Sequence, residues 1–125
     1  MMNKDRPKHL ALHKIKFPLP AIISIMHRIS GLLLFASLPI LLWMLQASLR
    51  SIETYTQLLG ILHHPLSKLF LLGLLWAFFH HFCAGIRYLA LDLHYGSSLK
   101  QARNSSKWVL GISLLLTVFA GGWLC

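Results

Sequence analysis

A polar stripe lies near the start of the chain, within an otherwise apolar stretch. Its members are three or four residues apart and share one face of a helix: Ser24, His27, Arg28 and Gly31. A serine and an arginine one turn apart can hydrogen-bond the carbonyl oxygen of a quinone. The basic pair His27 and Arg28 can bind the anionic propionates of a haem. The residue types therefore indicate the binding of a redox cofactor or of a quinone.

A second stripe with the same helical spacing lies further along the chain: His81, Gly85, Tyr88 and Asp92. A glycine one turn from a histidine leaves room for something flat, such as a porphyrin or a neighbouring backbone. A histidine on such a face suits the role of an axial ligand to haem iron. Because only one histidine clearly fits, ligation by two histidines would need a second helix, from this chain or from a partner.

Each of these residues also has a simpler interpretation. Arg28 can extend its side chain to the membrane surface without binding a ligand. His81 can be a hydrogen-bonding residue between helices, and Asp92 can form an interfacial ion pair with Arg87. The residues alone leave these alternatives open.

The elements that carry the stripes are expected to cross a membrane. Of the 125 residues, 56% are hydrophobic and only 12% are charged, and the mean hydropathy is +0.63. A soluble domain would carry about a quarter charged residues, so we expect one small all-α integral membrane domain. The net charge of +9 does not indicate nucleic-acid binding, because the basic residues flank apolar spans and form no soluble basic face.

Three transmembrane helices are expected, at about residues 21–45, 66–93 and 107–125. A span needs roughly 20 residues to cover a hydrocarbon core of about 30 Å. The uncharged runs 32–45 and 69–79 are too short by themselves, so the polar stripes must extend into the membrane. Ionisable residues there are costly and are by default a sign of function.

The segments between the spans are expected to be short. Residues 55–62 favour a short helix at the membrane surface, and residues 95–106 favour a basic loop. Pro39 lies inside the first span and is expected to kink it. No small-residue cleavage site follows the basic N-terminal segment, so we expect no removable signal peptide.

The lysines and arginines predict the orientation of the chain. Five of them precede the first span and four lie in residues 87–107, whereas only Arg50 and Lys68 lie in the first connection. The positive-inside rule then places the N-terminus in the cytoplasm and the C-terminus outside. Both polar stripes fall in the cytoplasmic half of the membrane, at matching depth.

Two segments resemble the signatures of the cytochrome b subunits of succinate dehydrogenase, part of complex II. The first-helix signature is matched by residues 24–31, Ser-Ile-Met-His-Arg-Ile-Ser-Gly, with Arg6-Pro7 and Phe17-Pro18 before it. The second signature is matched by residues 81–87, His-Phe-Cys-Ala-Gly-Ile-Arg, with Asp92 after it. The order, the spacing and the three spans are also similar, so the resemblance covers nearly the whole chain.

The resemblance implies a membrane anchor for a flavoprotein subunit and an iron–sulfur subunit, in a bacterial inner membrane with the C-terminus in the periplasm. It implies a second small haem-binding membrane subunit, so that the three spans form part of a heteromeric helix bundle. One haem b would be shared between the two anchors, and a ubiquinone site would lie beside the iron–sulfur subunit. Succinate itself would be oxidised in a partner subunit, and no catalytic residue is expected here.

The roles of individual residues follow from the same resemblance. His81 would be the axial ligand of the haem iron, chosen over His80 by its spacing to the following glycine. Ser24 and Arg28 would line the quinone site. His27 and Arg28 would lie near the haem propionates.

The sequence departs from the family pattern at Tyr88, where the family often has a histidine after the arginine. The His80-His81 doublet also leaves the register of the ligand ambiguous. Two other functions are compatible with the residues. One is an anchor subunit of a fumarate reductase, which runs the same chemistry in reverse. The other is a non-redox membrane scaffold or small transporter subunit, in which the polar residues only join helices.

Overall fold

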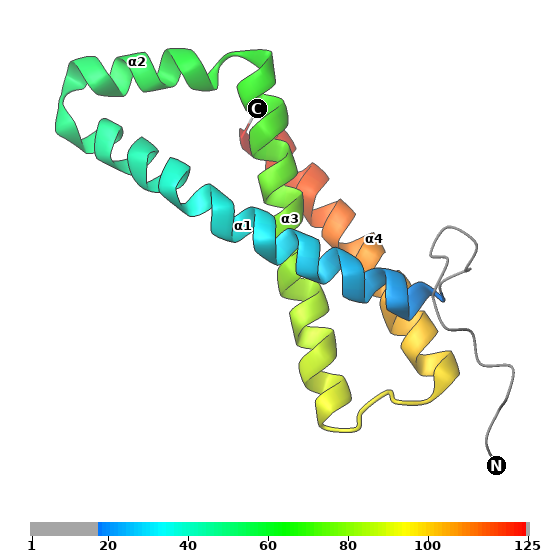
Figure 1. The fold of residues 1–125 in the computed structure, drawn as a ribbon. Helices are drawn as coiled ribbons and strands as arrows, with labels where there is room; N and C mark the ends of the chain where they lie inside the picture. Colours follow the sequence, from blue (N-terminus) through cyan, green and yellow to red (C-terminus); the bar gives the residue numbers. More distant parts are fainter. Residues whose placement is uncertain (1–17, 125) are drawn as a thin grey trace, which may run out of the picture.

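A computed structural model of the protein describes residues 18–124, which form four helices and no strand (Figure 1). The helices are α1 (Leu19–Arg50), α2 (Ile52–Leu62), α3 (Pro65–Asp92) and α4 (Leu99–Leu124). Of these, α1, α3 and α4 are long and apolar enough to cross a membrane. The prediction of an all-α membrane protein with three spans is confirmed.

The basic N-terminal segment and the two N-terminal dipeptides of the family signature, Arg6-Pro7 and Phe17-Pro18, lie wholly or partly outside the described residues.

The long helices are arranged as a crossing pair with a third helix alongside. Helix α1 crosses α3 at an angle, α4 packs along α3, and α2 bridges the far ends of α1 and α3 (Figure 1). The start of α1 also contacts α4, so all three long helices meet at the end of the bundle where the chain enters α1. The candidate residues of α1 and α3 lie near this meeting point.

The first connection contains more helix than predicted. Helix α2 begins at Ile52 instead of residue 55, because Ser51 and Thr54 form a reciprocal capping box. The Ser51 hydroxyl accepts the Thr54 amide at 3.1 Å, and the Thr54 hydroxyl accepts the Ser51 amide at 3.2 Å. The short helix itself is therefore confirmed, and α1 runs to Arg50, through Pro39, without a break in the helix.

The second connection is shorter than predicted. The prediction of a basic loop at residues 95–106 is wrong for most of that range, because α4 already begins at Leu99. The chain turns between α3 and α4 through two residues with positive φ, His94 at 64° and Gly96 at 66°. Ser98 then accepts the Gln101 amide at 3.2 Å, as a helix-capping side chain does. The polar residues at the start of α4 are thus helical, although they are too polar to belong to a membrane span.

Small residues allow the helices to approach closely. The buried core joins Ile23 of α1, Ala84 of α3 and Val109 of α4. Ser113 and Gly121 of α4 are buried, whereas Gly111 and Gly122 are exposed. Packing of small residues is what drives helix association in lipid, where apolar surface gives no advantage. Most large apolar side chains point outward, as expected for a chain that meets lipid or another membrane subunit.

Arg87 joins α3 to α4 instead of pairing with Asp92. Its side chain is buried, with Nε donating to Ser105 Oγ at 2.9 Å and Nη2 donating to the carbonyl of Ala102 at 3.2 Å. Asp92 is exposed at the end of α3. The sequence suggested an interfacial ion pair for Arg87, and the structure instead gives it two partners on the polar first turns of α4.

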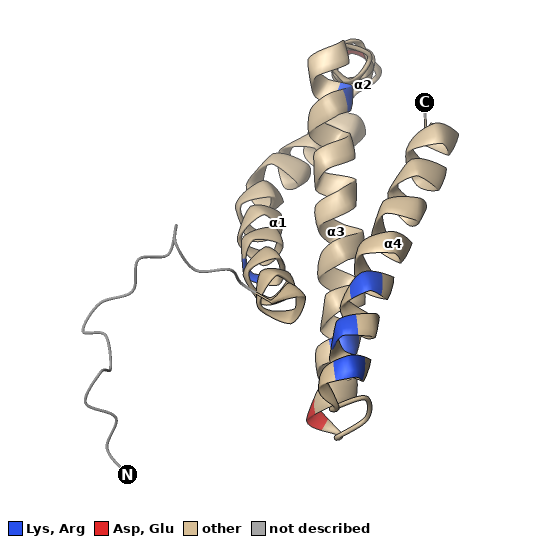
Figure 2. Cartoon of the chain, turned by 90° about the vertical axis from the view of Figure 1, so that its right-hand side faces the viewer, with Lys and Arg blue, Asp and Glu red and all other residues tan. Residues whose placement is uncertain are grey.

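The basic residues of α4 lie in its first half, next to the end of α3 (Figure 2). The opposite end of the bundle carries α2. Within the described residues, positive charge is therefore concentrated at the end of the bundle where α3 leads into α4, opposite α2.

Candidate functional site

Two histidine rings stack where α1 crosses α3. The ring centroids of His27 and His81 are 4.2 Å apart, and the ring planes differ by only 1°. The sequence predicted that the polar stripes of the two helices would meet at the same depth, and the stacked rings confirm that meeting. Tyr88, one helical repeat beyond His81, places its ring edge-on to His27, with the centroids 5.2 Å apart.

Hydrogen bonds hold one side of the His81 ring. Its Nδ1 lies 3.1 Å from the carbonyl oxygen of His27 and 3.3 Å from Ser30 Oγ. Ser30 Oγ in turn donates to the same carbonyl at 2.9 Å. Because a carbonyl oxygen can only accept, the bond to His27 requires a proton on Nδ1. That tautomer leaves the lone pair of the neutral ring on Nε2, which has no hydrogen-bond partner among residues 18–124.

Two glycines face the stacked rings, and one of them leaves space that a side chain would fill. A Cβ atom on Gly31 would lie only 2.8 Å from Cε1 of His81, and one on Gly85 would lie 3.8 Å from Nε2 of His27. Each helix thus offers a glycine to the histidine of the other helix. The sequence suggested a porphyrin or a backbone beside Gly85, and in this structure the His27 ring lies there. Gly31 is the tighter of the two positions, so it controls where the His81 ring can lie.

His80 has a different environment from its neighbour. It is completely buried and stacks on Trp76, with centroids 5.1 Å apart and planes 18° apart. Neither of its ring nitrogens has a hydrogen-bond partner in the described part of the chain, and both are sealed from the surface. A ligand could not reach His80 unless the helices moved apart. The geometry therefore distinguishes the two members of the doublet.

The donor set fits a haem better than a bare metal ion. Among residues 18–124, no group of three or more His, Cys, Asp or Glu residues is arranged to hold a metal. A haem iron, in contrast, already has four nitrogen ligands and needs only axial ones. Ligating histidines usually donate their second ring nitrogen to a carbonyl or carboxylate, which fixes the tautomer. His81 has this arrangement, with its Nδ1 on the carbonyl of His27.

Ser24 and Arg28 lie on α1 close to His27. Ser24 is partly buried and Arg28 is exposed. Within the described residues, neither side chain forms a hydrogen bond, and neither joins the network around His81. The stripe predicted from the sequence therefore divides into His27 with Gly31, which contact α3, and Ser24 with Arg28, whose polar groups remain available to a ligand.

Ser30 is the residue that the sequence analysis missed. It is fully buried and bonds both the His27 carbonyl and the His81 ring. Its position three residues after His27 was a usable signal, since residues at that spacing share a helix face.

Comparison with known proteins gives a consistent result. The family described as succinate dehydrogenase/fumarate reductase transmembrane subunit matches residues 2–120. A succinate dehydrogenase cytochrome b556 subunit from Coxiella burnetii is 40% identical over 124 residues, which cover 98% of this chain and 99% of the relative. The subunit of the same name from Paracoccus denitrificans is 34% identical over 116 residues, or 93% and 88% of the two chains. A mitochondrial cytochrome b560 subunit from Dictyostelium discoideum is 32% identical over 113 residues, or 89% and 58%.

Proposed function

The chain belongs to the succinate dehydrogenase/fumarate reductase transmembrane subunit family, and we propose that it anchors a succinate dehydrogenase, binds haem b and helps to form a ubiquinone-reduction site. The names of its relatives favour the direction from succinate to quinone over the reverse reaction of a fumarate reductase. The observation that carries the proposal is the His81 ring, which is held through Nδ1 and free at Nε2.

His81 is the proposed axial ligand of the haem iron, through Nε2. Ser30 and the His27 carbonyl hold the ring and its tautomer, which pre-organises the nitrogen for ligation. The proposal favours His81 over His80, because both nitrogens of His80 are enclosed. When bound, the haem supplies a site that accepts and returns one electron at a time. His27 and Arg28 are the proposed contacts of its anionic propionates.

The second axial ligand is expected from another subunit. His27 lies face to face with His81, and the nitrogen lone pairs of two stacked rings lie in separate parallel planes, so the two rings would not bind one iron together in this arrangement. His80 is enclosed, and the three remaining histidines of the described chain, His63, His64 and His94, lie in the connections between helices. Residues 18–124 therefore offer one clear ligand, which supports a haem shared with a second small membrane subunit.

Ser24 and Arg28 are the proposed quinone-binding residues. Reduction of ubiquinone takes up two electrons and two protons, so negative charge develops on its carbonyl oxygens. A hydroxyl and a guanidinium on one helix face can donate hydrogen bonds to such an oxygen, and the charged donor gains most as the charge develops. The exposure of Arg28 supports this role, because its donors are not used within residues 18–124.

The proposed partners are a flavoprotein subunit, which oxidises succinate, an iron–sulfur subunit and the second membrane subunit. The proposed location is the inner membrane of a bacterial cell, with the N-terminus in the cytoplasm and the C-terminus in the periplasm. The basic first half of α4 supports this orientation, since positive residues favour the cytoplasmic side. The quinone site then lies on the side where protons and the iron–sulfur subunit are available.

The test compares two activities in one purified complex. Reduction of soluble dyes by succinate requires only the flavoprotein and iron–sulfur subunits, whereas reduction of ubiquinone also requires the membrane site. Arg28→Leu should preserve the first activity and depress the second. A dithionite-reduced minus oxidised spectrum should show a b-type haem, and a complex that lacks it would favour the non-redox scaffold. A matched control is Arg50→Leu, at the far end of α1.

A further inference from the structure

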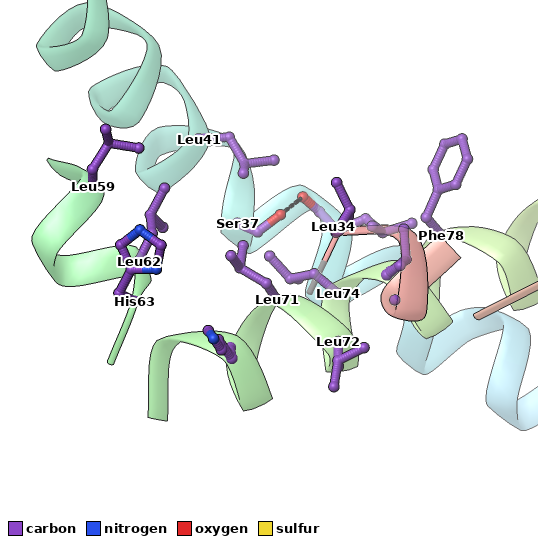
Figure 3. A pocket seen from close by; sticks show the side chains of 14 residues that line it. Leu34, Ser37, Leu41, Leu59, Leu62, His63, Leu71, Leu72, Leu74 and Phe78 are labelled. Atoms are coloured by element: carbon purple, nitrogen blue, oxygen red, sulfur yellow. Dashed lines mark hydrogen bonds between the residues drawn. The ribbon is translucent and has the colours of Figure 1, made fainter. Parts of the chain in front are cut away.

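An apolar cavity lies between the helices, away from the stacked histidines. It has a volume of about 550 Å³, is lined by α1, α2, α3 and the end of α4, and is partly open to the outside (Figure 3). Its wall is formed mainly by leucines, with Leu41 of α1, Leu59 of α2 and Leu74 of α3 as examples. The volume falls within the range of about 300–1,000 Å³ that is usual for small-molecule sites. The proposed haem and quinone residues do not line this cavity.

The cavity has the depth of one membrane leaflet. Along α3 its lining runs from Lys68 near the start of the helix to Phe78, ten residues further on. At 1.5 Å per residue this is about 15 Å, which is half of a hydrocarbon core of about 30 Å. The lining therefore begins near the membrane surface on the α2 side and ends near the middle of the membrane.

The polar groups of the cavity are at its surface end. Lys68 is the only charged residue in the lining, and His63 also lines the cavity, from the corner between α2 and α3. Ser37 faces the cavity from α1, but its hydroxyl donates to the carbonyl of Leu34 at 2.7 Å (Figure 3). The inner end thus offers only hydrocarbon to a ligand. A cationic mouth above a leucine wall is complementary to an amphiphile with an anionic head and an apolar tail.

We propose that this cavity binds an anionic phospholipid of the leaflet on the α2 side, with its phosphate at Lys68 and an acyl chain between α1 and α3. A phospholipid matches three features of the cavity: its depth, its apolar wall and its cationic end. The acyl chain is as long as one leaflet is deep and needs no polar partner, and the phosphate of the lipid is anionic. The proposal does not depend on the function assigned to His81 or Arg28. Bound lipid would fill the space that the crossing of α1 and α3 leaves open.

The test uses the complete complex, purified in mild detergent and reconstituted with spin-labelled phosphatidylglycerol. Electron paramagnetic resonance measures the fraction of label that the protein immobilises. Lys68→Gln should lower the affinity for this lipid about fivefold, which corresponds to about 1 kcal/mol for one basic residue at the membrane surface. Arg50→Gln is the matched control, because Arg50 lies on the same side of the bundle but outside the cavity. Spin-labelled phosphatidylcholine should bind more weakly than phosphatidylglycerol to the wild type.

A second pair of variants tests the acyl-chain end. Leu71→Trp should fill the cavity and reduce the immobilised fraction, because Leu71 is part of the lining. Leu69→Trp should not, because Leu69 lies outside the cavity and is 67% exposed. All four variants, the two at Lys68 and Arg50 and the two at Leu71 and Leu69, should reduce ubiquinone as the wild type does. Failure of the lipid proposal can therefore be distinguished from failure of the proposed function.

Three outcomes would overturn the lipid site: no immobilised lipid in the wild type, equal binding by Lys68→Gln and Arg50→Gln, or extraction of quinone instead of phospholipid from the cavity.

Discussion

Replacing Gly31 with alanine tests whether the space between α1 and α3 controls the position of His81, the proposed haem ligand. Gly31 faces the ring of His81, and a Cβ atom there would lie 2.8 Å from Cε1 and 3.3 Å from Nδ1. Both distances are shorter than an ordinary van der Waals contact. Since Nδ1 is also the atom that bonds the His27 carbonyl, the added methyl group acts directly on the bond that fixes the tautomer.

The size of the effect follows from that geometry. To restore a contact of 3.4 Å, the ring and α1 must separate by about 0.6 Å, the difference between 3.4 and 2.8 Å. Overpacking of this kind costs about 1–3 kcal/mol. At about 1.4 kcal/mol per factor of ten, haem retention should fall roughly five- to a hundredfold, unless α1 moves as a whole. The ring is held by hydrogen bonds on one side, so it has little freedom to turn away.

The assay is the reduced-minus-oxidised haem spectrum of the purified complex, normalised to dye reduction by succinate. Gly73→Ala is the control, because Gly73 is a helical glycine of α3 with no atom within 4 Å of an added Cβ. Gly31→Ala should lose haem at constant dye reduction, and Gly73→Ala should keep it. A Gly31→Ala complex with full haem and an unchanged spectrum would refute the placement of His81 beside Gly31 in the haem-bound protein.

Four further predictions concern single interactions. Ser24→Ala should lower ubiquinone turnover or affinity roughly two- to tenfold, because it loses a neutral hydrogen bond of about 0.5–1.5 kcal/mol. Arg28→Leu should lower it roughly ten- to a hundredfold, because it loses a charged hydrogen bond of about 1.5–3 kcal/mol. Dye reduction should stay intact in both, and an Arg28→Leu enzyme that reduces ubiquinone at the wild-type rate would contradict the quinone role. Ser30→Ala should weaken haem retention roughly two- to tenfold on detergent challenge, whereas Ser30→Thr should keep it. Ser105→Ala should destabilise the packing of α3 on α4 by about 1.5–3 kcal/mol, seen as a lower midpoint of thermal inactivation. Ser48→Ala is the control, because among residues 18–124 the Ser48 hydroxyl bonds only the Leu45 carbonyl of its own helix. A reporter fused to the C-terminus should be active only in the periplasm, and activity confined to the cytoplasm would reverse the topology.

The three spans could be predicted because hydropathy and length are local properties of the sequence. The start of α4 could not, since residues 99–106 are polar and resemble a loop by composition. They are helical where Ser105 and the Ala102 carbonyl bond the buried Arg87 of α3. That stabilisation comes from another helix, and no window of sequence around α4 contains it.

At the candidate site, too, local sequence patterns could be predicted and contacts between helices could not. Spacing and depth were sufficient to predict that the polar stripes of the two helices lie at matching depth. The angle at which α1 crosses α3 determines the rest: that Gly31 faces the His81 ring, and that Ser30 reaches Nδ1. Helix periodicity places residues on a face but does not say which atoms of two faces touch. The spacing to Gly85 already favoured His81 over His80, and the enclosure of both His80 nitrogens in the folded chain supports the same choice.

The most direct test of the central claim compares His81→Leu with His80→Leu in the assembled complex. The two residues are neighbours in sequence, and leucine removes a ring from each, so the pair controls for loss of a histidine in α3. His81→Leu should abolish or shift the b-type haem spectrum, because it removes the nitrogen that the His27 carbonyl and Ser30 hold in place. His80→Leu should leave the spectrum unchanged, since it removes two buried nitrogens that have no partner among residues 18–124. A normal haem spectrum in His81→Leu, together with its loss in His80→Leu, would contradict the account.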